Sequence, residues 1–309
     1  TTPPFAPKAH RVIQLFMNGG ASQCDLFDYK PQLIARDGQK FDPGPGERVE
    51  ASVSVPGAVM KSPFEWSQHG QSGRWVSSAL PHLAKSVDDM AFLMAMQSTS
   101  NVHGPAAYLQ TSGFQLPGFP CAGAWISYAL GSVNESMPAF VALPDARGLP
   151  YNGRSAFTSG FLPSNHQGLI IQASSEQPIT HLRPPNGAAH ITPKSREEGL
   201  NLLNEFNAAH AARRAEDSRL QARIQSYELA ARLQLSAPEL LDLSGETEAT
   251  KKLYGIDQKP TIDFGKRCLM ARRMIERGVR FVQVWSGHGG GANNWDNHAD
   301  IKKELSAAA

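Results

Sequence analysis

Residues 11–20, Arg-Val-Ile-Gln-Leu-Phe-Met-Asn-Gly-Gly, decide the fold class of this chain. A short apolar run that ends in two glycines is typical of a buried strand entering a tight turn. Similar runs follow at 139–143 (Ala-Phe-Val-Ala-Leu) and 280–285 (Arg-Phe-Val-Gln-Val-Trp), with helical patterns between them. This alternation of strand and helix predicts an α/β fold with a mostly parallel sheet and helices on both faces.

Further elements are predicted between these runs. Residues 90–96 (Met-Ala-Phe-Leu-Met-Ala-Met) are apolar and are predicted as another buried strand. Helices are predicted at 80–87, 105–110, 125–130 and 264–276, and the longest helical segment at 194–235. Residues 145–193 are rich in Gly, Pro and Asn and are predicted as a loop or lid. We therefore expect a linker or processed N-terminus at 1–10 and a single domain over 11–309.

Composition and motifs limit the classes of function. The formal net charge is +2 and the basic residues are spread along the chain, so nothing indicates a nucleic-acid partner. No apolar run approaches the roughly 20 residues that a membrane-spanning helix needs. A P-loop, a G-x-S-x-G elbow and a G-x-G-x-x-G turn after a strand are all absent. Their absence argues against nucleotide kinases, the usual α/β serine hydrolases and Rossmann dehydrogenases.

The densest group of potential metal ligands follows the last predicted strand. Asp296 and His298 stand two positions apart in a Gly- and Asn-rich loop, with His288 and Asp300 nearby. A carboxylate and an imidazole on such a loop can converge on one Zn, Mn or Fe ion. Asp and His in loops of this composition also serve as turn-forming and surface residues. The position after a buried strand strengthens the metal hypothesis.

The segment after the first strand carries further candidates. In open α/β sheets, ligands bind at the carboxyl ends of the strands. The turn at Gly19 and Gly20 can present backbone N–H groups to an anion. Asp25 and Asp28 either cap a helix or contact a metal ion or substrate, and spacing alone leaves both alternatives open.

The polar loop at 98–104 is a third candidate region, because it follows the run at 90–96. It combines hydroxyl side chains with His103. A hydroxyl nucleophile needs an adjacent base or a metal ion to activate it. His103 can be that base, can orient a substrate, or can be a polar loop residue without a catalytic role.

Several segments together resemble the DUF1501 family. They are RVIQLFMNGGASQCDLFDYKPQL (11–33), NVHGPAAYLQTSG (101–113), LLDLSGETEATKKLYG (240–255), FGKRCLMARRMIERGVRFVQV (264–284) and NNWDNH (293–298). The family is related to the alkaline-phosphatase and sulfatase superfamily. The resemblance therefore implies a three-layer α/β/α sandwich, incomplete here at its C-terminal end. It also implies metal-assisted hydrolysis of sulfate or phosphate esters.

The resemblance also implies roles for single residues. Asn18 stands about where the superfamily has its first metal-binding Asp, and Asp25 follows seven positions later. The sulfatase nucleophile motif would fall at 101–105, where its Cys or Ser and its Arg are absent and His103 replaces the Pro. Asp296 and His298 resemble a D-x-x-x-H metal site with shortened spacing.

These comparisons give a set of expected site residues. The expected ligands of a divalent ion (Zn, Ca or Mn) are Asp25, Asp296 and His298. The expected catalytic residues are His103 and Asn101, and the expected substrate-binding residues are Asn18, Gly19 and Gly20.

Two functions remain open. The first is a sulfatase-like, metal-assisted hydrolase of a small-molecule or polysaccharide ester. The second is a non-catalytic secreted relative that binds carbohydrate or a partner protein. It is suggested by the missing nucleophile motif and by aromatic loops at 64–66 (Phe-Glu-Trp) and Trp75. Family members commonly carry an export signal, so the resemblance implies a periplasmic or secreted location. No oligomeric state is predicted.

Overall fold

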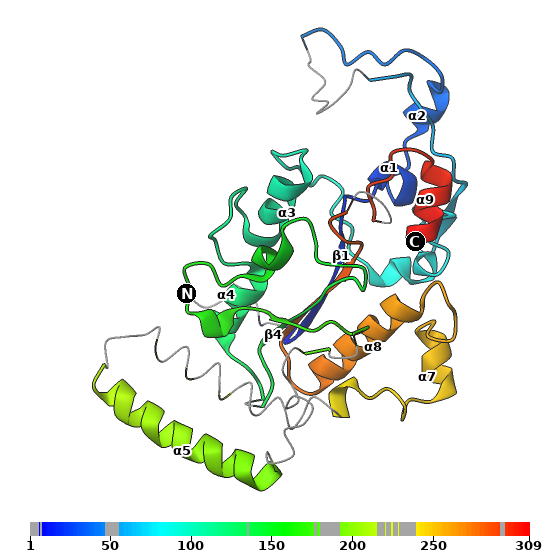
Figure 1. Ribbon diagram of the computed structural model, residues 1–309. Coiled ribbons are helices and arrows are strands. Elements are labelled where there is room, and N and C mark those ends of the chain that lie inside the picture. Colours follow the sequence, from blue (N-terminus) through cyan, green and yellow to red (C-terminus); the bar gives the residue numbers. More distant parts are fainter. Residues whose placement is uncertain are drawn as a thin grey trace.

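The computed structural model describes residues 6, 8–46, 56–134, 136–175, 178–179, 192–214, 220, 224, 228, 239–290 and 294–309 (Figure 1). Its centre is a four-stranded sheet in the order β1-β6-β4-β5, and every neighbouring pair runs parallel. The strands are β1 (Val12–Met17), β4 (Phe140–Leu143), β5 (Leu169–Ile170) and β6 (Phe281–Ser286). The predicted α/β class and mostly parallel sheet are confirmed.

Helices and a separate hairpin surround this sheet. The described α-helices are α1 (Gln23–Leu26), α2 (Pro31–Ala35), α3 (His103–Ser112), α4 (Ala122–Leu130), α5 (Pro193–Ala212), α7 (Glu248–Leu253), α8 (Ile262–Glu276) and α9 (Ile301–Ala308). The 3-10 helices are η1 (Leu83–Asp89), η2 (Gly153–Phe157) and η3 (Ser164–His166), and the antiparallel hairpin consists of β2 (Trp66–His69) and β3 (Arg74–Ser77). None of the helices described here is long and apolar enough to cross a bilayer.

The apolar runs at 11–17, 139–143 and 280–285 form β1, β4 and β6, as predicted. The predicted burial of the first run is wrong, because β1 lies at the edge of the sheet and its Val12 and Leu15 side chains are 42% and 57% exposed. β6 lies between β1 and β4 and pairs with both. Most of its side chains are buried on both faces, which is why its sequence is a continuous apolar run. Phe16 of β1 stacks on Trp285 of β6, with ring centroids 4.0 Å apart, so side chains reinforce the pairing of the edge strand.

Helices cover both faces of the sheet. On one face, Met274 of α8 packs in the cluster that contains Val282 of β6. On the other face, α4 approaches β4 closely at Gly123, where a Cβ atom would lie 2.6 Å from the Phe140 ring. The two faces are therefore filled by different helices. The more specific expectation, an alkaline-phosphatase-like sandwich that is incomplete at its C-terminal end, stays a prediction.

A second apolar cluster joins the segments that follow β1 and β6. Leu26 of α1, Val76 of β3 and Leu305 of α9 are buried in it together with Trp295. Trp295 lies in the loop after β6, and its indole Nε1 donates a hydrogen bond to Ser286 Oγ at 2.9 Å. The cluster therefore anchors that loop beside the segment after β1.

The strand predicted at 90–96 is wrong, because this segment has no strand structure. Phe92 alone is anchored, with its ring against Phe27 and under the guanidinium of Arg74. Leu93 and Met96 are 76% and 74% exposed. An apolar run becomes a strand only where a neighbouring strand satisfies its backbone, and the pattern of the run itself does not reveal such a neighbour.

The two long segments of the predicted domain are described in part. α5 covers the first half of the helical segment at 194–235, and Thr192 and Ser195 form a capping box at its start. In the predicted loop or lid at 145–193, the described residues include η2, η3 and β5. Residues 180–191 and most of 215–238 lie outside the described residues.

Candidate functional site

The carboxyl ends of the parallel strands bring three loops together at one edge of the sheet. The loop after β6 folds back over the end of β1: Asn18 N donates to Ser286 O, and Trp295 N donates to Asn18 O, both at 2.9 Å. The two segments also approach closely at Gly19, whose φ is +107° and where a Cβ atom would lie 2.7 Å from Asp296 N. Only glycine fits this position, so the Gly-Gly turn allows the loop to close.

This closure places three potential ligands side by side. His103, the first residue of α3, lies with its Nε2 2.9 Å from Asp296 Oδ2. His298 Nε2 lies 2.6 Å from the other carboxylate oxygen, Oδ1. One ligand atom from each residue lies within 4.8 Å of the others, and this is the only such group of three His, Cys, Asp or Glu side chains in the described part of the chain. The arrangement can hold one metal ion.

The group is partly open to solvent. His298 is exposed, whereas the side chains of His103 and Asp296 are partly buried. Three protein ligands leave further coordination positions for water or a substrate, which is the pattern of catalytic rather than structural zinc sites. The exposed side of the group provides access to those positions.

Two residues behind these ligands were missed at the level of sequence. Tyr151 lies in the loop after β4, and its ring stacks on the imidazole of His103. Asn294 is buried and accepts a hydrogen bond from Asp296 N at 2.8 Å. Asn294 belongs to the NNWDNH segment and lies two positions before Asp296, but it was not singled out as a site residue. Tyr151 gave no signal, because its contact with His103 depends on the tertiary fold.

The remaining expected residues lie around this group. Asn18 is buried at the end of β1, and neither its side-chain oxygen nor its nitrogen has a hydrogen-bond partner among the described residues. Asn101 is exposed in the loop before α3, two positions from His103. Asp25 lies in α1, where its Oδ2 accepts a hydrogen bond from Ser22 Oγ at 2.6 Å. It is not part of the three-ligand group.

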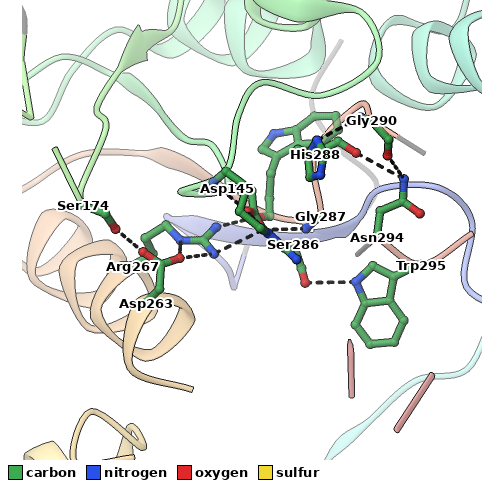
Figure 2. A network of polar contacts seen from close by, with 12 residues as sticks. Asp145, Ser174, Asp263, Arg267, Ser286, Gly287, His288, Gly290, Asn294 and Trp295 are labelled. Atoms are coloured by element: carbon green, nitrogen blue, oxygen red, sulfur yellow. Dashed lines mark hydrogen bonds and ion pairs between the residues drawn. The ribbon is translucent and has the colours of Figure 1, made fainter. Parts of the chain in front are cut away.

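A buried polar network supports the same edge of the sheet (Figure 2). Arg267 of α8 is 2% exposed, and its guanidinium contacts Asp263 at 2.8 Å and Asp145 at 3.6 Å and donates to the carbonyl oxygen of Trp285. Asp145, at the end of β4, also accepts a hydrogen bond from Gly287 N at 2.8 Å. The network therefore ties α8 to the ends of β4 and β6.

The charge of Asp145 is strongly stabilised. Burial by itself raises the pKa of this carboxyl group, but hydrogen bonds from the side chain and backbone of Arg147 and from Gly287 N outweigh burial. The pKa is consequently lowered from 3.8 to about 2. A depressed pKa of this kind links the stability of the fold to pH.

We expect Asp145→Asn to flatten the acid dependence of stability. The ionised carboxylate contributes about 2 kcal/mol above pH 4, and this contribution is lost as the pH falls from about 4 to about 2. The Asn side chain does not titrate, so the variant lacks this pH-dependent contribution to the free energy of unfolding. Denaturant unfolding at pH 5 and pH 2.5 measures it: the stability difference between wild type and variant should shrink at the lower pH. Parallel pH profiles for the two proteins would contradict the assignment.

The fold and this edge define the molecule as an α/β protein with a candidate metal centre at the carboxyl ends of a parallel sheet. The chain belongs to the family described as "Protein of unknown function (DUF1501)", whose model matches residues 9–309. The family resemblance seen in the sequence is confirmed. No curated protein and no solved structure matches the chain.

Proposed function

We propose that this chain is a metal-dependent hydrolase of sulfate or phosphate esters, with its ion held by His103, Asp296 and His298. The observation that supports this most directly is the convergence of three ligand atoms within 4.8 Å of one another. They converge at the carboxyl edge of a parallel sheet, where open α/β folds bind their ligands. The reaction class follows from the relation to the sulfatase and alkaline-phosphatase superfamily that the family resemblance implies, and it is part of the proposal.

The donor set favours zinc among the expected ions. Two imidazoles and one carboxylate suit Zn, and Mn also accepts such ligands. Calcium takes six to eight oxygen ligands, which this group does not offer. The carboxylate of Asp25 is engaged by Ser22, so we leave Asp25 out of the proposed ligands. His103 accordingly becomes a ligand instead of the base that the sequence suggested.

The chemistry divides between the ion and the chain. When bound, such an ion polarises the ester oxygen and lowers the pKa of a coordinated water. Hydrolysis of a sulfate or phosphate ester adds water across the ester bond and releases an alcohol together with sulfate or phosphate. In our proposal, Gly19 and Gly20 present backbone N–H groups to the anionic ester, and Asn101 contacts its oxygens. Asn18 is left out of the substrate contacts, because its side chain is buried.

Substrate and location follow from the family resemblance. We propose a small-molecule or polysaccharide ester as substrate and a periplasmic or secreted location. The ester would enter from the side on which His298 is exposed.

A second candidate function is the binding of carbohydrate or a partner protein, and a different surface favours it. The aromatic loops first suggested for it are packed: Phe64 is 8% exposed, and Trp66 and Trp75 both contact the ring of Tyr29. An exposed row of rings lies elsewhere, on α4 and neighbouring loops, with centroids of successive rings 3.8 to 6.4 Å apart. It consists of the exposed rings of Phe114, Phe161, Trp125 and Tyr128 and the half-buried ring of Phe119. Exposed aromatic patches of this kind mark binding surfaces.

Elemental analysis paired with turnover tests the hydrolase proposal. We expect about one Zn per chain, as a single three-ligand site implies, and turnover of an aryl sulfate or an aryl phosphate. A chelator should abolish the turnover and added Zn should restore it, with Mg as the matched control that does not. Protein that binds no Zn and shows no turnover in the presence of excess Zn would overturn the proposal and favour the binding function. Bound Zn without turnover would overturn the hydrolase activity alone.

A further inference from the structure

We infer that Asn294 and Tyr151 are positioning residues that hold His103 and Asp296 in the geometry needed for the ion. This inference rests on the proposed function and deepens it. It identifies the part of the chain that prepares the metal centre without touching the ion. Both residues lie outside the set of ligands, and neither was singled out by the sequence.

Asn294 provides the fixed point of this arrangement. Its Oδ1 accepts a hydrogen bond from Asp296 N at 2.8 Å. Its Nδ2 carries two N–H groups and lies within hydrogen-bond distance of three acceptors, Gly290 O and Tyr151 Oη at 2.9 Å and His288 O at 3.2 Å, so one N–H group is shared between two acceptors. A backbone N–H can only donate and carbonyl oxygens can only accept, so these partners determine which end of the amide is oxygen and which is nitrogen. Figure 2 shows the amide nitrogen of Asn294 directed at His288 and Gly290. The buried amide is thereby held in one orientation and fixes the backbone at Asp296.

Tyr151 links this fixed point to the other ligand. Asn294 Nδ2 donates to Tyr151 Oη at 2.9 Å, which places the phenol ring. The ring stacks on the imidazole of His103 with centroids 4.5 Å apart and an interplanar angle of 6°. Gly289 lets the chain pass close by, because a Cβ atom there would lie 2.8 Å from the backbone of Tyr151. One amide therefore orients Asp296 through its backbone and His103 through a stacked ring.

A second contact between the loop after β4 and α3 holds the start of this helix in place. Asn152 Nδ2 donates to Gly104 O at 3.0 Å, one residue after His103. The loop after β4 thus contacts the start of α3 twice, through the ring of Tyr151 and through the hydrogen bond from Asn152. Residues that orient metal ligands in this way typically contribute 10- to 100-fold to metal affinity.

The Zn affinities of wild type, three variants and one control variant test the inference. Competition with a chromophoric chelator at fixed pH gives the Kd of wild type, Asn294→Ala, Tyr151→Leu and Tyr151→Phe. We expect the first two variants to bind Zn about 10- to 100-fold more weakly than wild type. Tyr151→Phe keeps the stacked ring and loses only the hydrogen bond, so its affinity should lie between those of wild type and Tyr151→Leu. Tyr254→Leu, which changes a tyrosine at the end of α7 outside both proposed sites, is the matched control and should bind Zn like wild type.

The outcomes separate this inference from the proposed function. If wild type binds Zn and all variants bind it within about threefold, the positioning role is overturned and the metal centre stands. If wild type binds no Zn, both are overturned. Unfolding of the metal-free proteins separates a general loss of structure from a local effect. Weaker Zn binding by Tyr151→Leu with an unchanged unfolding midpoint supports the positioning role, whereas Tyr151→Phe as weak as Tyr151→Leu contradicts the role of the stack.

Discussion

Asp296→Ala is expected to weaken Zn binding by more than about 100-fold, beyond the loss produced by residues that only orient ligands. Asp296 is the only carboxylate in the three-ligand group, and its two oxygens face His103 and His298 at 2.9 and 2.6 Å. Without it, two neutral imidazoles remain to hold a doubly charged ion. The measurement is the Kd for Zn, together with turnover of the aryl ester in the same preparation.

Asp300→Ala is the matched control, because it removes a carboxylate four positions away. Asp300 is exposed and caps α9 by accepting a hydrogen bond from Lys303 N at 3.1 Å. Its loss should cost about 1 kcal/mol of stability through the cap and leave Zn binding unchanged. If Asp296→Ala binds Zn as tightly as wild type, the proposed metal centre at this edge of the sheet is wrong.

Arg267→Ala is expected to lower the free energy of unfolding by about 3 to 5 kcal/mol. The guanidinium is almost fully buried between Asp145 and Asp263 and also donates to the carbonyl oxygen of Trp285. Removing one partner of such a network leaves buried acceptors and a buried carboxylate less well compensated. Denaturant unfolding of the metal-free protein measures the loss apart from any contribution of an ion.

Arg272→Ala tests whether burial is the cause of this effect. Arg272 lies on the same helix and pairs with Glu276 at 2.8 Å, but both side chains are about half exposed. An exposed pair of this kind contributes little to stability, because solvent screens it. Equal losses in the two variants would mean that the network around Arg267 stabilises the fold no more than a surface ion pair does.

The core strands could be predicted because their signal is local. β4 and β6 are buried on both faces, so each is a nearly continuous apolar run. β1 has the same apolar pattern although it is an edge strand, and its Val12 and Leu15 side chains are exposed. Residues 90–96 show the same pattern without forming a strand, since pairing depends on a partner elsewhere in the chain. The strand order β1-β6-β4-β5 is likewise a property of the assembled sheet and not of any single segment.

In the candidate site too, the residues that local sequence reveals differ from those that only the fold brings together. Asp296 and His298 were found because two ligand types stand close together in sequence after a strand. His103 was noticed as a loop histidine, but its approach to Asp296 appears only in the fold. The contacts of Tyr151 with Asn294, and of Arg267 with Asp145, join residues more than a hundred positions apart. Motif spacing relates only residues that lie close together in the sequence, so it could not predict these contacts.

The contact between His103 and Asp296 spans 193 positions of the chain. In an unfolded chain, bringing two such distant points together costs about 5 kcal/mol of loop-closure free energy. An unfolded chain would keep only Asp296 and His298 as close neighbours, so an ion held by all three ligands favours the folded state by mass action. Such an ion acts as a removable cross-link between early and late parts of the sequence. Its occupancy then reports whether α3 and the loop after β6 have been assembled around the sheet.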